Sequence, residues 1–447
     1  MRHSILQIAA YTLITGLLGI SNLQAQDTTK LTLQHAIELG IKNSKELKGN
    51  AARVAEAVAQ TREAKDRQLP DASISGSYLY FPVQPNVNLK INTGGSGGSG
   101  GGSSIPKVDQ VLYGTVGVSE TLFAGGKIRY GIESAKYLEQ ATKLNADNNR
   151  QEVVINTINA FANLYKAKKA VELVKENLAQ SQQRVTDFTN LEKNGVIARN
   201  DLLKVELESS NIELALLDAE NNYKLASVNM NLMLGLPEQT SLDPDSTSLV
   251  QANPDSIKTI DQYETSAIQT RKEIAALALQ KKAADLGIKS AKADYYPNLA
   301  ISTAYIGVDV PGLLTVTNAW DVGAALKYNI SSLWKTKAAV HEAEARSLEI
   351  EANTEALNDK IRLQINQAYE NYLLSQKKIE VLAKAVAQST ENYRITKNKY
   401  DNSLETTTNL LDADVASLQA QLNYTNAKAD AVVSYNILLQ TAGLLNN

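Results

Sequence analysis

The stretch Trp320-Asp321-Val322-Gly323-Ala324-Ala325-Leu326-Lys327-Tyr328-Asn329-Ile330 sets large apolar residues against small or polar neighbours in alternation. Successive side chains of a strand point to opposite faces, so this order gives one apolar face with aromatic margins and one small polar face that carries charge. Such a pair of faces is typical of a transmembrane barrel strand, with lipid on one side and water on the other. Taken alone, the stretch is equally compatible with a strand of a soluble sandwich.

Three further segments share this pattern, and together the four predicted strands cover residues 72–81, 111–123, 299–308 and 319–330. Each has about the length that a tilted strand needs to cross a membrane. They form two hairpins. Four strands cannot close a barrel, and an open sheet edge is not tolerated in lipid, so we expect several copies of the chain to share one barrel.

Long helices follow each strand hairpin. No proline occurs between Lys107 and Leu236 or after Pro311, and both stretches are rich in residues with high helix propensity. Apolar residues recur there at helical spacing, so one face of each helix packs in a bundle or coiled coil. Turn residues interrupt the stretches at Lys193-Asn194-Gly195 and Asp401-Asn402-Ser403. We therefore expect two helical hairpins with arms of roughly 60 residues, about 90 Å long.

An internal repeat connects the two halves of the chain. Pro70, Ile74, Ser75 and Tyr78 recur as Pro297, Ile301, Ser302 and Tyr305; Leu202-Leu203 recurs as Leu410-Leu411, and Gly235-Leu236 as Gly443-Leu444. A repeat of this length predicts a tandem pair of structural units.

The predicted domain organisation begins with a signal peptide at 1–25. A short apolar run from Ile5 to Ile20 follows Arg2 and His3, and the small residue Ala25 is suitable for cleavage; an uncleaved anchor is the alternative. The rest divides as follows: a first repeat at 26–236 with an N-terminal helix, strand hairpin 72–123, Gly-rich loop 94–104 and helical hairpin 127–236; a linker at 237–256; and a second repeat at 257–447 with a helix, strand hairpin 299–330 and helical hairpin 335–445.

Composition excludes several classes of function. A net charge of −3 argues against nucleic acid as a partner, and the absence of cysteine excludes thiolate sites and disulfides. No motif of a nucleophilic, metallohydrolase or phosphate-binding site is present. His341 lies near Glu342 and Glu344, which indicates a solvated helix face. We predict no enzyme activity, no cofactor and no metal.

The chain resembles the TolC-like outer-membrane efflux family, also called outer membrane factors. The resemblance is carried by the opening segment Leu31–Leu39 with Asn43–Leu47, by Leu122-Phe123-Ala124-Gly125-Gly126-Lys127, and by the duplication. It implies an α+β membrane protein in the outer membrane of a Gram-negative-type bacterium, extending into the periplasm. Three chains would form a homotrimer with a 12-stranded β-barrel, four strands per chain, in outer-membrane lipid. A long periplasmic α-helical coiled-coil barrel would continue it.

The resemblance also assigns roles to the hairpin tips. Segments 194–201 and 400–404 match the tips that meet a periplasmic adaptor, which implies adaptor contacts for Gly195, Val196, Ile197, Ser403 and Leu404. Ser403 stands where glycine is usual.

The resemblance further implies a periplasmic gate. Tyr400 and Asp201 match the pair that holds the closed entrance; Asp412 matches one member of an aspartate ring, Asn409 replaces the other, and Glu405 stands where arginine can occur. Three Asp412 carboxylates brought close together would attract cations and repel anions. A solvated helix face is the alternative for Asp412.

These features predict the outer-membrane channel of a tripartite efflux system, a passive exit duct for small molecules such as drugs. It would work with a periplasmic adaptor (membrane fusion) protein and an inner-membrane transporter of RND or ABC type. The alternatives are the outer-membrane duct of a type I protein secretion system and a structural coiled-coil protein that spans the envelope.

Overall fold

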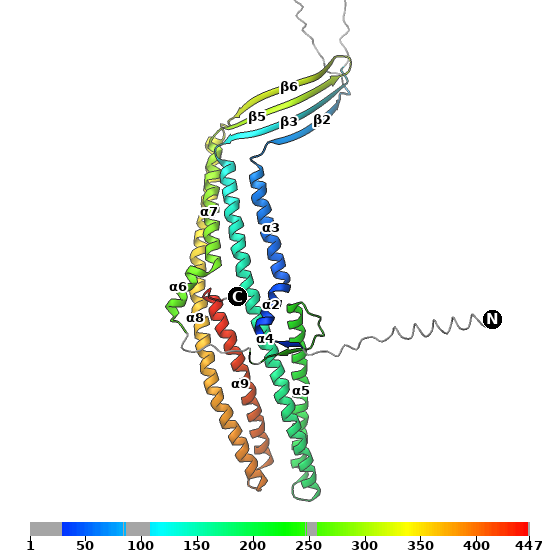
Figure 1. Ribbon diagram of the computed structural model, residues 1–447, viewed down its shortest axis with the longest axis vertical. Coiled ribbons are helices and arrows are strands. Elements are labelled where there is room, and N and C mark those ends of the chain that lie inside the picture. The colour runs from blue at the N-terminus through cyan, green and yellow to red at the C-terminus, as the bar shows by residue number, and fades with distance from the viewer. Residues whose placement is uncertain (1–28, 84, 86–107, 246, 248–256, 446–447) are drawn as a thin grey trace, which may run out of the picture. The chain divides into compact units, whose positions relative to one another are not determined.

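A computed structural model describes residues 29–83, 85, 108–245, 247 and 257–445 (Figure 1). The chain divides into two compact units. Residues 49–148 and 272–359 form one, called here the strand unit; the described parts of residues 1–48, 149–271 and 360–447 form the other, called the tip unit. The predicted signal peptide and Gly-rich loop lie outside the described residues.

The strand unit contains one sheet of four antiparallel strands in the order β2-β3-β5-β6 (Figure 1). The strands are β2 (Asp71–Tyr80), β3 (Gln110–Ala124), β5 (Asn298–Val310) and β6 (Leu314–Lys327). All four predicted strands are confirmed. β6 begins five residues earlier than expected, because a tight turn with Gly312 at φ 77° separates it from β5.

One face of this sheet is apolar. Cross-strand pairing joins Ile74 to Val116, Val116 to Tyr305 and Tyr305 to Trp320, so the alternating residues of all four strands form continuous rows. The rings of Tyr305 and Trp320 meet edge to face with centroids 5.3 Å apart. Ile74 is 83%, Trp320 72% and Val322 87% exposed, so no described part of the chain covers this face.

The opposite face of the sheet is polar. Ser75 lies opposite Thr115, and their hydroxyls are 2.7 Å apart. On β6, the carboxylate of Asp321 accepts a hydrogen bond from the backbone amide of Ala304 at 2.9 Å. The predicted alternation is therefore confirmed across the sheet.

Four helices meet the sheet at the ends of its strands. These are α3 (Lys45–Asp66), α4 (Lys127–Lys193), α7 (Lys272–Lys292) with the short 3₁₀ turn η3 (Ala293–Tyr295), and α8 (Ser332–Asp401). At the passage from β3 to α4, Gly125 has φ 62°, and a Cβ there would lie 2.6 Å from the carbonyl oxygen of Ala293. Only glycine fits this close approach. α4 and α8 continue from the strand unit into the tip unit.

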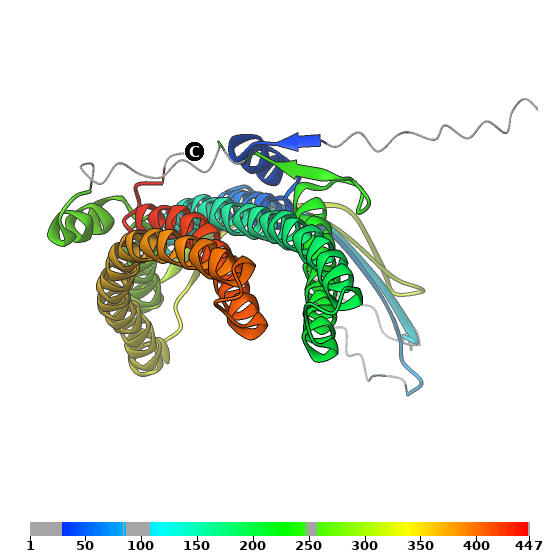
Figure 2. The same cartoon turned by 90° about the horizontal axis from the view of Figure 1, so that it is seen from below.

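The tip unit is built from helices α2 (Leu33–Asn43), α5 (Arg199–Leu234), α6 (Ile260–Thr270) and α9 (Thr407–Thr441), together with the far parts of α4 and α8. A short parallel pair, β1 (Thr29–Leu31) and β4 (Leu242–Pro244), completes it. Figure 2 views the long helices nearly end-on.

The main core of the tip unit joins α2, α4, α5 and the β1–β4 pair. Its fully buried side chains include Leu31, Phe161, Leu164, Met230, Leu234 and Leu242. The expected helical stripe is confirmed, since Ile158 and Phe161 on α4 and Ile361 and Ile365 on α8 are all buried. α9 lies along α4, where Lys166 Nζ and Asp430 Oδ1 pair at 2.8 Å.

The expectation of helical arms of roughly 60 residues was wrong for the second helix of each hairpin. α4 and α8 contain 67 and 70 residues, whereas α5 and α9 contain only 36 and 35. The returning arms are short because the chain leaves each helix near a left-handed glycine, Gly235 at φ 69° and Gly443 at φ 68°. No helix of the described chain is long and apolar enough to cross a bilayer.

Candidate functional site at the hairpin tips

The turn between α4 and α5 forms the first hairpin tip. The amide of Val196 donates to the carbonyl of Leu191 and that of Gly195 donates to Glu192, both at 2.9 Å. This is a Schellman motif, in which the residue after the C-cap has left-handed backbone angles. Gly195 supplies them with φ 71°, and a Cβ at this position would meet nothing within 4 Å. The left-handed backbone angles, and not a lack of space for a side chain, therefore favour glycine at this position.

The turn between α8 and α9 repeats this motif without a glycine. Leu404 donates to Lys399 and Ser403 to Tyr400, both at 2.8 Å. Ser403 adopts φ 61°, a conformation that costs an L-residue free energy. The same backbone turn is thus built twice, and the second copy is strained.

Each tip exposes one large apolar side chain. Val196 is 65% exposed and Leu404 is 76% exposed, and they occupy the same position of the two turns. Ile197 instead packs partly against the small core beneath the first tip. The tips therefore offer two apolar side chains as contact points.

The two returning helices begin differently. Thr406 caps α9, because its hydroxyl accepts from the amide of Asn409 at 3.2 Å, whereas Ala198 at the start of α5 provides no side-chain cap. The Asn409 side chain also donates to Glu405. This bond, together with the backbone amide of Thr406, lowers the pKa of the exposed Glu405 carboxyl. Of the expected gate residues, Asn409 thus forms part of this cap.

Tyr400 packs inside the tip rather than standing free. Its ring stacks on Phe188 with centroids 5.4 Å apart and planes 6° apart, beside the buried Leu202 and Val205. Burial raises the pKa of the Tyr400 hydroxyl, and the nearby carboxylate of Asp201 raises it further, while a hydrogen bond with Thr407 acts in the opposite direction.

The Asp201 carboxylate lies near enough to Tyr400 to raise the pKa of its hydroxyl, yet no hydrogen bond joins the two side chains in the described part of the chain. The Asp201 carboxylate pairs instead with Lys204 at 3.4 Å, and the same ammonium lies 3.4 Å from the hydroxyl of Thr408 on α9. Lys204 thus bridges the starts of α5 and α9.

Asp412 and Asp414 have opposite environments on α9. Asp412 is exposed and has no partner within the described residues, which leaves its carboxylate free to face another molecule or a pore. Asp414 is only 5% exposed. Its carboxylate receives a hydrogen bond from Arg184 of α4 at 2.9 Å and a longer one from Asn177 at 3.4 Å.

Arg184 completes a buried polar cluster that joins three helices. Its second terminal nitrogen donates to the hydroxyl of Tyr393 on α8 at 3.0 Å, and its side chain is 10% exposed. Burial alone would lower the pKa of this guanidinium, but the Asp414 carboxylate and Tyr393 outweigh it and raise the pKa. Arg184 therefore stays charged and ties α4 to both α8 and α9.

The sequence contains a signal for this cluster. Asn177, Ser181, Arg184 and Phe188 follow one another at spacings of four, three and four, the phase of a buried helix stripe. Asp414 likewise follows Leu410 and Leu411 in the buried phase of α9. Charged residues in a buried phase indicate a paired site, and only the fold shows that they meet.

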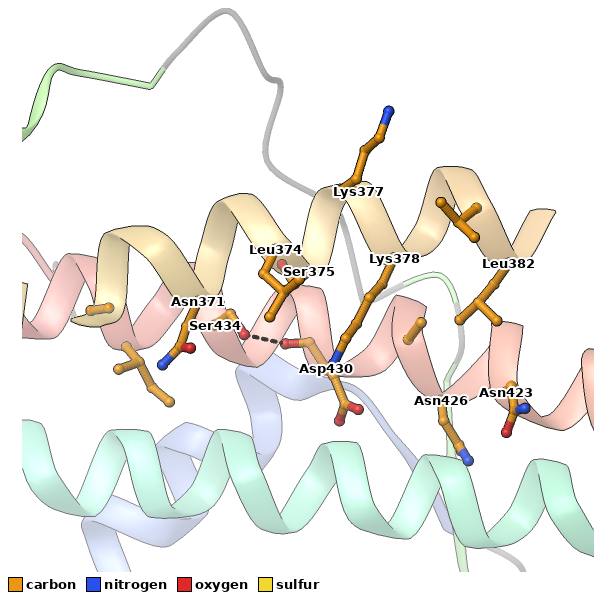
Figure 3. Close-up of a pocket in the computed structure, with 14 residues that line it drawn as sticks. Asn371, Leu374, Ser375, Lys377, Lys378, Leu382, Asn423, Asn426, Asp430 and Ser434 are labelled. Carbon is orange, nitrogen blue, oxygen red and sulfur yellow. Dashed lines mark hydrogen bonds between the residues drawn. The ribbon is translucent and has the colours of Figure 1, made fainter. Parts of the chain in front are cut away.

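A groove of about 730 Å³ runs between α8 and α9, farther from the tips (Figure 3). Exposed apolar side chains, Leu374 and Val381, line it together with Lys378, Asn426 and Asp430. Figure 3 shows Lys377 pointing away from α9. In the described ranges no three His, Asp or Glu side chains gather as a metal site requires.

Comparison with known proteins decides the family. The model of the outer membrane efflux protein family matches residues 36–236 and 265–444, which is most of the chain. The chain belongs to this family. The resemblance noted in the sequence is thereby confirmed, and this outer membrane efflux protein is a channel of the outer membrane that extends into the periplasm, not an enzyme.

Individual relatives agree with this assignment. The chain is 22% identical over 350 residues to the outer membrane efflux protein BepC of Brucella suis, covering 76% of this chain and 74% of that relative. Its fold is similar to that of VceC from Vibrio cholerae, with a TM-score of 0.73 and 18% sequence identity. This match covers 92% of this chain and 96% of the VceC chain. The fold is also similar to that of the CmeC channel of Campylobacter jejuni, with a TM-score of 0.74 and 17% sequence identity. This match covers 92% of this chain and 86% of the CmeC chain.

Proposed function

We propose that this outer membrane efflux protein is the passive exit duct of a tripartite efflux system for small molecules such as drugs. A periplasmic adaptor and an inner-membrane transporter of RND or ABC type would supply the energy and the cargo. The observation that carries the proposal is the sheet of the strand unit. It has an exposed apolar face and a polar face, and within the described residues the outer edges of β2 and β6 have no partner strand.

The open edges of the sheet support a barrel shared between chains. Unpaired backbone groups at β2 and β6 cannot be left in lipid, so they must pair with other strands. Pairing β6 of one copy with β2 of the next closes a ring, and three copies give a 12-stranded barrel. Its apolar face would meet lipid and its polar face, with Ser75, Thr115 and Asp321, would line water.

The helices of the tip unit support the same homotrimer. α5 carries exposed leucines at roughly heptad spacing, and α8 carries exposed apolar residues beside the groove of Figure 3. We expect the α5 seam of one copy to fill the α8–α9 groove of the next, because an unpaired apolar seam is stabilised by burial. The residues of the α5 seam are Leu203, Leu207, Leu214, Leu217, Leu225 and Leu232.

The tandem duplication fits this assembly. The family match falls in two blocks, 36–236 and 265–444, which supports a first repeat at 26–236, a linker at 237–256 and a second repeat at 257–447. Each repeat contributes one strand hairpin and one helical hairpin. Two repeats in each of three chains would build a wall with nearly six-fold symmetry.

The tips would form the periplasmic gate and the adaptor contact. Gly195, Val196 and Ile197 at the first tip, with Ser403 and Leu404 at the second, would contact the adaptor. Their support is the matched turn geometry and the exposed Val196 and Leu404.

Tyr400, Asp201, Asn409 and Asp412 would form the gate. Asp412 is exposed and has no partner among the described residues, which supports a ring of three carboxylates at the constriction. The Asp201 carboxylate lies near enough to Tyr400 to raise the pKa of its hydroxyl.

Assembly is tested by placing charge in the α5 seam. The double variant Leu214→Asp/Leu217→Asp should run as a monomer in detergent on size-exclusion chromatography with light scattering, whereas the wild type runs as a trimer. Glu220→Lys, on an exposed position of the same helix, is the matched control and should remain trimeric. A wild-type monomer, or a trimer that survives the double substitution, would contradict the proposal.

Cargo is tested in cells that lack the chain. We expect the deletion strain to become sensitive to small toxic compounds, and the adaptor and the pump to co-purify with the complementing protein. Loss of a secreted polypeptide with unchanged sensitivity would instead assign the duct to type I secretion.

A further inference from the structure

The helix ends that adjoin the sheet carry an excess of positive charge. Within residues 61–70, 125–136, 289–297 and 328–339 there are ten cationic and four anionic side chains, although the whole chain has a net charge of −3. All ten cations are exposed. We call them the basic collar: Arg62, Lys65, Arg67, Lys127, Arg129, Lys136, Lys289, Lys292, Lys335 and Lys337.

Most of the collar is not neutralised within the protein. Of the ten side chains, the described part of the chain pairs Arg67 with Glu63 at 3.4 Å, Lys127 with Asp294 at 2.7 Å, and Lys292 with Glu344 at 3.7 Å. Among the described residues, no carboxylate lies within salt-bridge distance of the other seven. A surface of this kind favours an anionic partner.

Exposed apolar side chains accompany these cations. At the passage from β6 to α8, Ile330 is 64%, Leu333 56% and Trp334 63% exposed, directly before Lys335 and Lys337. At the passage from η3 to β5, Tyr296 is 58% exposed. Aromatic and basic residues side by side are typical of a membrane–water interface, where rings lie at the level of the headgroups and ammonium groups contact phosphate.

One part of the collar forms a groove large enough for a headgroup. Between the end of α3 and the start of α4 a cavity of about 580 Å³ is lined by Lys65, Arg129 and Lys136, with Tyr137 beside them. Glu133 is the single carboxylate that lines it. Three cations against one anion leave net positive charge in a site open to solvent.

We infer that the basic collar binds anionic phospholipid headgroups in the leaflet that faces the periplasm, with the groove of Lys65, Arg129 and Lys136 as the principal site. The inference rests on the proposed barrel, since the strands of the sheet must lie in the membrane for the helix ends to meet its surface. The collar then fixes the depth of the channel, because its cations hold the helix ends at the level of the phosphates.

The test compares two charge-matched triple variants of the purified full-length protein. The collar variant is Lys65→Gln/Arg129→Gln/Lys136→Gln. The control is Lys175→Gln/Lys360→Gln/Lys397→Gln, which removes three exposed lysines of the tip unit. Delipidated protein is titrated with phosphatidylglycerol and with phosphatidylcholine, and bound lipid is counted by native mass spectrometry.

We expect the wild type and the control to bind phosphatidylglycerol at least tenfold more tightly than phosphatidylcholine, and the collar variant to lose this preference. Equal binding of the two lipids, or an unchanged preference in the collar variant, would overturn the inference. Displacement by millimolar inorganic phosphate would identify a general anion site and overturn the lipid assignment. Pore conductance of the same samples separates the two proposals: a working pore without lipid preference refutes only the collar, whereas the absence of a pore refutes the duct.

Discussion

The ion pair between Arg184 and Asp414 provides the sharpest test of how the tips are held. Asp414→Leu removes one partner and leaves the guanidinium buried, and Arg184→Met does the reverse. Their side chains are only 10% and 6% exposed, so neither remaining charge can be solvated by water. Leaving one partner of a buried pair alone costs about 3–5 kcal/mol, whereas replacing both by apolar residues is often neutral or stabilising.

The double variant Arg184→Met/Asp414→Leu should therefore recover most of what either single variant loses. It leaves Asn177 without its partner at 3.4 Å, which costs about 1–3 kcal/mol. We thus expect the double variant to be more stable than both single variants, and the pair to show strong coupling in the double-mutant cycle.

Amide hydrogen exchange of α4 and α9 near the tips measures this directly, because it reports local opening. A loss of 3–5 kcal/mol corresponds to exchange faster by on the order of 10²–10³-fold or more. The exposed pair Arg394–Glu391, whose side chains are 61% and 54% exposed, is the control, and Glu391→Leu should leave exchange at the tips unchanged. If Asp414→Leu changes exchange no more than Glu391→Leu, the account of the tip cluster is wrong.

Three further predictions concern the turns and caps. Ser403→Gly relieves the left-handed strain at φ 61° and should stabilise the second tip by about 1 kcal/mol, seen as slower amide exchange in the last turn of α8. Gly195→Ser should destabilise the first tip by a similar amount, seen as faster amide exchange in the last turn of α4. Ala198→Thr adds the side-chain cap that α5 lacks and should stabilise the start of this helix by about 1 kcal/mol. If amide exchange at the start of α5 does not become slower, this prediction is refuted. The pKa of Glu405 is lowered in the folded protein, so its carboxylate stabilises the α9 cap above the unfolded pKa near 4.5, and this stabilisation is lost as pH falls through the folded pKa. Amide hydrogen exchange of residues 406–411, corrected for the intrinsic rate at each pH, should therefore become faster toward pH 3. Glu405→Gln should abolish this pH dependence.

The sheet and the tip turns could be predicted from the sequence because they depend on local order. Alternation in 319–330 fixes the faces of a strand whatever its neighbours are, and Asn194-Gly195 marks a turn by its backbone preferences. The unequal arms were missed, because helix propensity says where a helix can form and not where it must pack.

The polar cluster required the fold. Arg184 and Asp414 are 230 positions apart, and nothing local couples them. Family matching selected Asp412, which is exposed, while the buried partner is Asp414, two positions further along α9. A search for charged residues in the buried phase of each helix would have found both members of the pair but not their contact.

Single-channel conductance in a planar bilayer tests whether this chain forms a pore closed at its hairpin tips. We expect a pore in the wild type that multivalent cations block from the periplasmic side, since three Asp412 carboxylates would line the constriction. In Asp412→Ala the pore should remain and the block should disappear. No conductance from the wild type, or an unchanged block in Asp412→Ala, would contradict the account.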